Sequence, residues 1–133
     1  LHIKDYCETV QVLLRAESNK ISNQIFNVGY QNMSISDLAF LVKNVVEKEF
    51  PEKKNIEIIK TTSDDNRSYH INSDKINKIL GFKPKRSIEK AVKDLCKAFK
   101  EKKIINSFEN DLYFNVNRLK KLKVKGKKKG KLH

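Results

Sequence analysis

The clearest hydrophobic pattern in the chain predicts a helix that begins after Ser34. Apolar residues recur at positions i, i+3, i+4 and i+7 from Ile35 to Phe50, which is the spacing of one helix face. Asp37 lies three residues after Ser34, as in a capping box, and Pro51 cannot continue a helix. We therefore expect a helix that ends just before Pro51.

Three other stretches show the same spacing, and each follows a residue that commonly caps a helix. They are residues 6–14 after Asp5, residues 74–80 after Ser73, and residues 88–99 after Ser87. Gly81 suits the end of the second of these helices, because glycine readily adopts a positive φ angle.

Two short runs rich in β-branched residues predict strands. They are QIFNV at residues 24–28, which stops at Gly29, and NIEIIK at residues 55–60. Two short strands do not make a stable sheet, so we expect them to join a sheet that other sequence supplies. Strands and helices together predict a small α/β unit, with two to three short strands packed with about four helices.

Most of the formal net charge of +13 comes from the C-terminal end. Residues 118–133 hold nine Lys and Arg and no acid, so residues 1–117 keep 29 − 9 = 20 basic against 16 acidic residues. We expect one domain over residues 1–117 and a disordered basic tail over residues 118–133. The tail would bind polyanions weakly, which leaves a non-catalytic module that binds nucleic acid or another polyanion as an alternative function.

Patterns typical of catalytic and cofactor sites are missing from the sequence. The four glycines form no phosphate- or dinucleotide-binding loop, and the three histidines are too scattered to predict a metal site. No apolar run approaches the roughly 20 residues of a membrane-spanning helix. Two distant cysteines, Cys7 and Cys96, suit buried thiols in a reducing cytoplasm. We expect a cytoplasmic chain that catalyses nothing and binds no metal by itself.

The polar segment 61–72 is the best candidate for a binding loop. If it is extended, Arg67 and Tyr69 share one face, so a guanidinium that suits phosphate and a hydroxyl that suits sugar or phosphate could reach one ligand. Nucleic-acid binding by the body is not expected, because its charge excess is small. The alternative for the loop is structural: Arg67 pairs with Asp64 or Asp65, and Tyr69 fills a gap.

Asn27 is a further candidate, because it ends the first expected strand and could present its amide to a ligand there. Its alternative role is to stabilise the turn at Gly29. For Asp5, a helix cap is the more ordinary role than a catalytic acid.

Four segments resemble, in order and spacing, the extended short-chain dehydrogenase/reductases, which include NAD-dependent nucleotide-sugar epimerases and dehydratases. LHIKD is similar to the family's hydrophobic-His-Val-x-Asp segment, and QIFNVG to its Tyr/Phe-Asn-Val-Gly strand. The run from NRSYHINSDK to GFKPKRSIEKAV resembles its Arg-x-Tyr and Leu-Gly-Phe/Trp-x-Pro region, and DLYFNVNRLK resembles the C-terminus of one subgroup. The likeness covers about residues 1–120.

This resemblance implies that the chain is the C-terminal, substrate-binding part of such an enzyme, a small helix-rich subdomain of a Rossmann-type protein. Arg67 and Tyr69 would then hold the nucleoside diphosphate of a nucleotide-sugar, Asn27 would lie near this substrate, and Asp5 would be structural. NAD would bind an N-terminal Rossmann half, and no cofactor is expected to bind this chain alone.

The chain departs from the family where catalysis would occur. It has neither the glycine-rich NAD loop nor the Tyr-x-x-x-Lys catalytic pair, so we expect a fragment that is inactive alone. Its expected partners are the nucleotide-sugar substrate and the missing half. A second alternative is an interaction protein whose exposed apolar edge pairs with a partner. The sequence does not distinguish epimerisation, dehydration and reduction, and it does not identify the sugar or the nucleotide.

Overall fold

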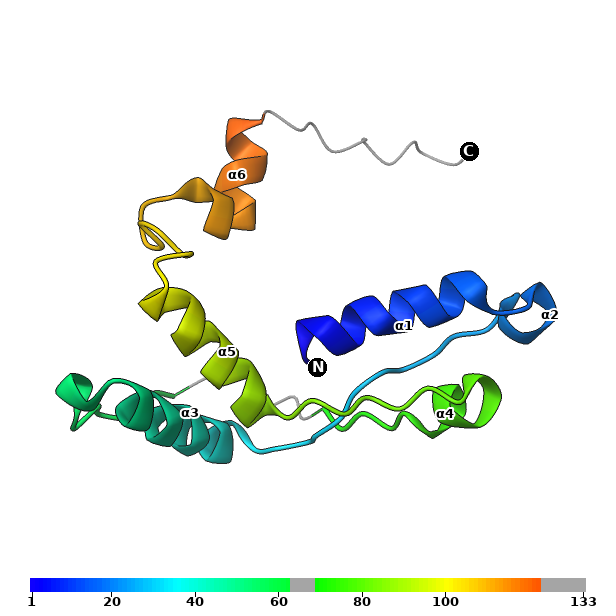
Figure 1. The fold of residues 1–133 in the computed structure, drawn as a ribbon, viewed down its shortest axis with the longest axis horizontal. Coiled ribbons are helices and arrows are strands. Elements are labelled where there is room, and N and C mark those ends of the chain that lie inside the picture. Colours follow the sequence, from blue (N-terminus) through cyan, green and yellow to red (C-terminus); the bar gives the residue numbers. More distant parts are fainter. Residues whose placement is uncertain (63–68, 123–133) are drawn as a thin grey trace. The chain divides into compact units, whose positions relative to one another are not determined.

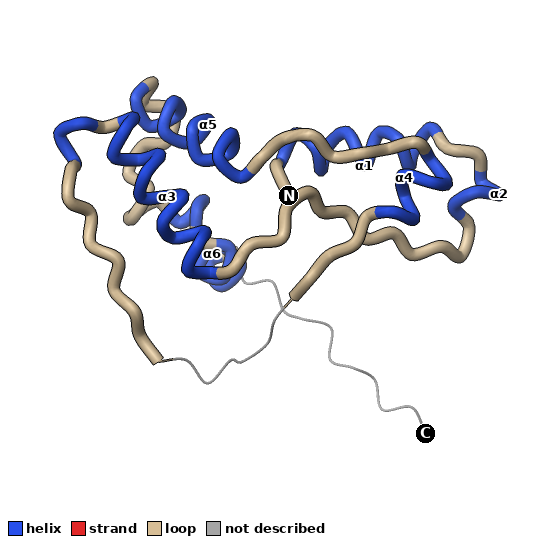
Figure 2. Tube along the Cα trace, turned by 90° about the horizontal axis from the view of Figure 1, so that it is seen from below, coloured by secondary structure: helices blue, strands red, loops and turns tan. Residues whose placement is uncertain are grey.

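The computed structural model describes residues 1–62 and 69–122, and their regular structure is helical (Figure 1). The helices are α1 (Ile3–Arg15), α2 (Ser18–Ile21), α3 (Ile35–Glu49), η1 (Pro51–Lys53), α4 (Asp74–Leu80), α5 (Ile88–Lys100), η2 (Asp111–Tyr113) and α6 (Asn115–Lys121), where η marks a 3-10 turn. The predicted α/β class is wrong for this part of the chain, because it contains no strand (Figure 2).

The two runs predicted as strands lie in connecting segments, and the reason is their hydrogen bonding. A strand needs a neighbouring backbone to pair with, and β-branched residues do not supply one. The run at 55–60 is bound by side chains of α3 instead: Ile56 N donates to Glu47 Oε1 at 2.9 Å, and Lys43 Nζ donates to Ile56 O. The run at 24–28 leads into a segment that is likewise held by side chains.

The chain divides into two compact units, Leu1–Lys97 and Ala98–His133, and each is described by itself. In the first unit, α1 and α4 border one shared hollow, and α3 and α5 border another. Connecting segments join these two helix pairs. No helix within the described ranges is long and apolar enough to cross a bilayer.

Several helix ends were predicted correctly from residues close to them in sequence. Ser34 caps α3, because its Oγ accepts a hydrogen bond from Asp37 N at 3.0 Å, and the helix ends before Pro51. Gly81 ends α4 with a φ of 66°, and Ser87 Oγ accepts from Lys90 N at 3.1 Å in the first turn of α5.

Two predicted caps are wrong. The cap of α1 is His2, whose Nδ1 accepts from Lys4 N at 3.1 Å, whereas Asp5 lies inside the first turn. Ser73 precedes α4 but makes no capping hydrogen bond. Its place is taken by Asn72, whose Oδ1 accepts from Asp74 N at 2.7 Å. Both predicted side chains bind distant segments instead.

The second unit contains a helix that the sequence pattern did not predict. Helix α6 begins at Asn115 and includes Arg118 and Lys121, the first part of the expected basic tail. Both cations lie 3.4 Å from Asp111 Oδ2, which brings η2 and α6 together. Residues 123–133 lie outside the described residues.

Candidate functional site

The candidate site lies in the first unit, where two segments distant in sequence are joined by the hydroxyl of Ser73. Gly29 N donates to Ser73 Oγ at 2.7 Å, and Ser73 Oγ donates to Gly29 O at 2.8 Å. Both polar backbone groups of Gly29 are therefore bound by one side chain. The same two hydrogen bonds occupy the hydroxyl, so Ser73 serves as a structural link and not as a nucleophile.

A second link runs parallel to the first and uses one side-chain amide. Asn32 Nδ2 donates to Ile71 O at 3.0 Å, and Ile71 N donates to Asn32 Oδ1 at 2.9 Å. This side chain satisfies both backbone groups of Ile71, which a strand partner would otherwise do. The segment that follows Asn27 is thus held against the segment that follows Tyr69, without a β-ladder.

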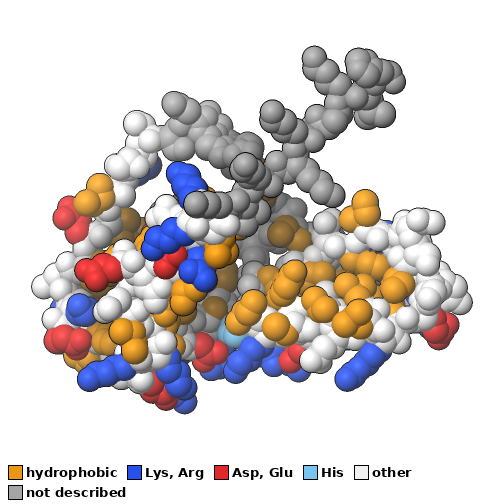
Figure 3. All heavy atoms as spheres, turned by 90° about the horizontal axis from the view of Figure 1, so that it is seen from above, with side chains coloured by type: hydrophobic (Ala, Val, Ile, Leu, Met, Phe, Trp, Pro, Cys, Tyr) orange, Lys and Arg blue, Asp and Glu red, His pale blue; other side chains and the backbone are white. Residues whose placement is uncertain are grey.

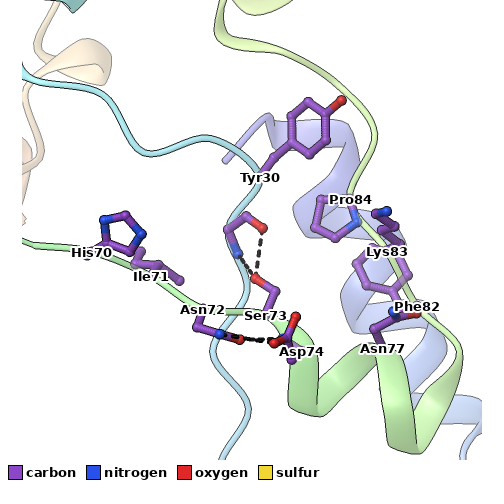
Figure 4. Close-up of a pocket in the computed structure, with 11 residues that line it drawn as sticks. Tyr30, His70, Ile71, Asn72, Ser73, Asp74, Asn77, Phe82, Lys83 and Pro84 are labelled. Atoms are coloured by element: carbon purple, nitrogen blue, oxygen red, sulfur yellow. Dashed lines mark hydrogen bonds between the residues drawn. The ribbon is translucent and has the colours of Figure 1, made fainter.

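A cleft of about 320 Å³ opens beside these links (Figure 4). It is lined by Gly29, Tyr30, His70, Ile71, Asn72, Ser73, Asp74, Asn77, Phe82, Lys83 and Pro84. The lining combines two aromatic rings with amide, carboxylate, imidazole and ammonium groups. Such groups bind hydroxyls, and the amide and ammonium groups can also bind phosphate. The volume lies at the lower end of the range for small-molecule sites.

The close approach of the two segments depends on the absence of a side chain at position 29. A Cβ placed on Gly29 would lie 2.9 Å from Ile71 Cγ2 and 3.2 Å from Ile71 Cβ. Real Cβ atoms do not approach carbon so closely, so a larger residue would force the two segments apart. The cleft wall is therefore built around this glycine.

Substitution of Gly29 by alanine is expected to lower the free energy of unfolding by about 1–3 kcal/mol, the usual cost of overpacking. Urea denaturation followed by circular dichroism would measure it. The double variant Gly29→Ala/Ile71→Ala removes the methyl group at 2.9 Å and should recover most of the loss. A double variant no more stable than Gly29→Ala would contradict the proposed steric cause.

The structure brings the predicted ligand-binding segments together, but not the predicted residues themselves. Asn27 and Tyr69 are exposed and neither lines the cleft, whereas Tyr30 and His70, close to them in sequence, do. Arg67 lies outside the described residues.

The cleft is supported by a buried carboxylate at the start of α1. Asp5 is fully buried, and its oxygens accept hydrogen bonds from Lys85 N at 3.3 Å, Arg86 N at 2.9 Å and Arg86 Nη1 at 2.5 Å. The second guanidinium nitrogen of Arg86 donates to Glu8 Oε1 at 2.6 Å. These bonds hold α1 against the segment that leaves the cleft at Pro84.

The environment of Asp5 favours its charged form. Burial opposes ionisation, but the hydrogen bonds from the backbone and guanidinium of Arg86 and from Lys85 N outweigh it and lower the pKa of Asp5 below its ordinary value of 3.8. A carboxylate held ionised in this way does not act as a general acid near neutral pH. Asp5 is structural, as the resemblance implied, although it does not cap the helix.

His2 attaches the same end of α1 to α5. Its Nδ1 accepts from Lys4 N, so the proton lies on Nε2, which donates to Asp94 Oδ2 at 3.2 Å. A hydrogen bond from Lys90, assisted by that of His2, lowers the pKa of Asp94. Within residues 1–62 and 69–122, no three His, Cys, Asp or Glu side chains are placed to hold a metal ion.

Sequence reasoning missed the residues that assemble the site. Ser73 was expected to cap a helix, and neither Asn32 nor Arg86 was singled out. Each bonds a partner 39 or more positions away in sequence, so no local pattern marks it. The sequence therefore held no signal that could have identified them.

The chain was compared with known proteins. No protein-family model, no curated protein and no solved structure matches it.

Proposed function

We propose that this chain is the substrate-binding part of an NAD-dependent nucleotide-sugar epimerase or dehydratase, and that it holds the nucleoside diphosphate of the substrate. The support is that the three resembling segments in the first unit contact one another in two places. Asp5 of LHIKD binds Arg86 of FKPKRS, and Gly29 of QIFNVG binds Ser73 of NRSYHINSDK.

In this proposal, the cleft binds one part of the substrate and the residues expected from the sequence bind the other part. The cleft offers the rings of Tyr30 and Phe82 and polar groups for a sugar or base, while Arg67 and Tyr69 follow from the sequence as ligands of the diphosphate. Asn27 would lie near the substrate. Binding energy from the nucleotide would orient the sugar for chemistry that takes place elsewhere.

The redox chemistry would come from NAD on a separate cofactor-binding half, because this chain has no dinucleotide loop and no Tyr-x-x-x-Lys pair. By itself the chain would bind the substrate without converting it. A cytoplasmic location suits this role, because Cys7 is a free thiol, although it is exposed and not buried as the sequence predicted.

Replacement of Arg67 by alanine is expected to weaken the binding of a nucleoside diphosphate by roughly tenfold to a hundredfold, because a hydrogen bond to a charged group contributes about 1.5–3 kcal/mol. Isothermal titration calorimetry with UDP, ADP and TDP on the full chain would measure the dissociation constants. A chain that binds none of these nucleotides, or binds them equally well after the substitution, would rule out this role.

Polyanion binding through the tail can be distinguished from binding at the cleft by its dependence on salt and on the charge of the tail. Binding through the basic tail would fall steeply with salt and would disappear when the Lys residues at 123, 125, 127, 128, 129 and 131 are replaced by glutamine. Binding at the cleft would survive these substitutions. Two cations of this tail, Arg118 and Lys121, already pair with Asp111, which reduces the charge available for a polyanion.

A further inference from the structure

The second unit exposes an apolar face on helix α6. The side chains of this face, called the α6 face below, are Val116, Leu119 and Leu122, with exposed fractions of 58, 52 and 56%. Residues three positions apart lie on one side of a helix, and the backbone of Leu122 is still helical, so the three side chains share one side. Figure 3 shows Lys and Arg side chains beside hydrophobic ones left of its centre, where α6 faces the viewer.

A different side of α6 carries the ion pairs of the unit. Arg118 Nη1 and Lys121 Nζ each lie 3.4 Å from Asp111 Oδ2. These two cations are also three positions apart, so helix α6 is bound to η2 through its polar side. The apolar side is left exposed to solvent.

The sequence places cations directly beside the α6 face. Residues 118–133 hold nine Lys and Arg and no acid, and seven of these cations are not among those that pair with Asp111. Aliphatic residues are interleaved with the cations, as in LKKLKVK at residues 119–125, whereas residues 118–133 contain no Phe, Tyr or Trp. A matching partner therefore offers apolar surface and negative charge side by side.

The surface of an anionic lipid bilayer meets both requirements. An amphipathic helix that lies on a bilayer buries its apolar side chains at the boundary between headgroups and acyl chains. Clusters of about four to eight Lys or Arg on such a helix are typical of binding to anionic headgroups. Nucleic acid offers phosphates, but the stretch has none of the aromatic side chains that stack on its bases.

Two protein partners fit this stretch less well than a bilayer. A second copy would bring nine more cations against these nine, and like charges oppose such a contact. A protein groove that binds a helix selects anchor residues at helical spacing. The cations from Lys123 onward instead recur at spacings of one and two residues, and Gly126 and Gly130 interrupt them. A continuous anionic surface needs no such spacing.

We propose that the α6 face and the basic residues that follow it bind the surface of an anionic lipid bilayer. The apolar side chains enter the boundary between headgroups and acyl chains, and the cations bind the headgroups. The helix lies along the bilayer and does not cross it. The α6 face belongs to the second unit and the cleft to the first, so lipid binding and nucleotide binding can be measured independently.

Sedimentation of the full chain with vesicles tests the two components of this surface. The chain should bind vesicles of equimolar phosphatidylcholine and phosphatidylserine, should lose this binding as salt is raised, and should not bind phosphatidylcholine alone. Leu119→Gln/Leu122→Gln should weaken the binding roughly tenfold or more, because two apolar side chains are no longer buried. Ile25→Gln/Ile35→Gln is the matched control and should change nothing, since both isoleucines are 81% exposed in the first unit.

A fluorescent reporter tests insertion directly, whether or not the glutamine variants disturb the helix. The chain contains no tryptophan, so Leu119→Trp introduces a single one. Its emission should shift to shorter wavelength on the phosphatidylserine vesicles and should be quenched by brominated lipid. The emission of Ile35→Trp should stay unchanged.

Equal binding to the two kinds of vesicle would overturn the proposal, as would an unchanged emission of Leu119→Trp on vesicles that bind the chain. Stronger binding to duplex DNA or to polyglutamate than to the vesicles would assign the cations to nucleic acid or to an acidic protein instead. A dimer in sedimentation velocity that Leu119→Gln/Leu122→Gln dissociates would assign the α6 face to a second copy. Titration of the same variants with UDP reports on the cleft alone, so failure of this proposal leaves the proposed function intact.

Discussion

The variant Arg86→Ala is expected to lose about 3–5 kcal/mol of unfolding free energy, because it leaves a buried carboxylate without its cation. Asp5 is fully buried and lies 2.5 Å from Arg86 Nη1. The backbone hydrogen bonds from residues 85 and 86 remain in the variant, so the loss should fall near the lower end of this range. That is still a large part of the total stability of a domain, about 5–15 kcal/mol.

Urea denaturation at neutral pH would measure the loss, with Lys90→Ala as the control. Lys90 also pairs with an acid, Asp94, but its side chain is 55% exposed. Exposed pairs one helical turn apart contribute only about 0.3–0.5 kcal/mol. If the two variants were equally stable, the bond between Asp5 and Arg86 would not be a principal support of the unit.

The pH dependence of stability offers a second test of the bond between Asp5 and Arg86. Because the pKa of Asp5 is lowered in the folded chain, its contribution is complete above the ordinary value of 3.8 and is lost as pH falls through the lowered value. Without the guanidinium, the folded and unfolded pKa values approach each other, so Arg86→Ala should show a smaller loss of stability on acidification. Identical acid profiles would contradict this.

Features encoded by neighbouring residues were predicted well. The helix between Ser34 and Pro51 follows from a cap, an apolar face and a proline, all within one segment. The end of α4 follows from Gly81, whose φ of 66° suits glycine. Such features need no information from the rest of the chain.

Strands and side-chain links could not be predicted in the same way. The run at 24–28 has the composition of a strand, but a strand forms only with a hydrogen-bonding neighbour, and here the adjoining backbone is bound by the side chains of Ser73 and Asn32. The orientation of α1 is a related case. Its apolar spacing predicted a helix correctly, yet the face turned inward is set by Arg86, far away in sequence.

Position 76 in α4 should be the most sensitive apolar site in the first unit. Ile76 is completely buried, and buried hydrophobic residues in the described part of the chain are few: Val45, Ile76, Phe82 and Cys96. Ile76→Ala is expected to cost about 2–5 kcal/mol through lost burial and a residual cavity, whereas Ile76→Val should cost about 0.5–1.5 kcal/mol. Thermal and urea unfolding would give both values.

The control is Ile79→Ala, three residues along the same helix, where the side chain is 38% exposed. Alanine favours helix more than isoleucine does, so both alanine variants gain the same small helix propensity and differ only in burial. The difference between them therefore measures burial alone. Equal stability of the two would mean that the position of α4 depends on the polar links made by Ser73 and Asn32 and not on its apolar face.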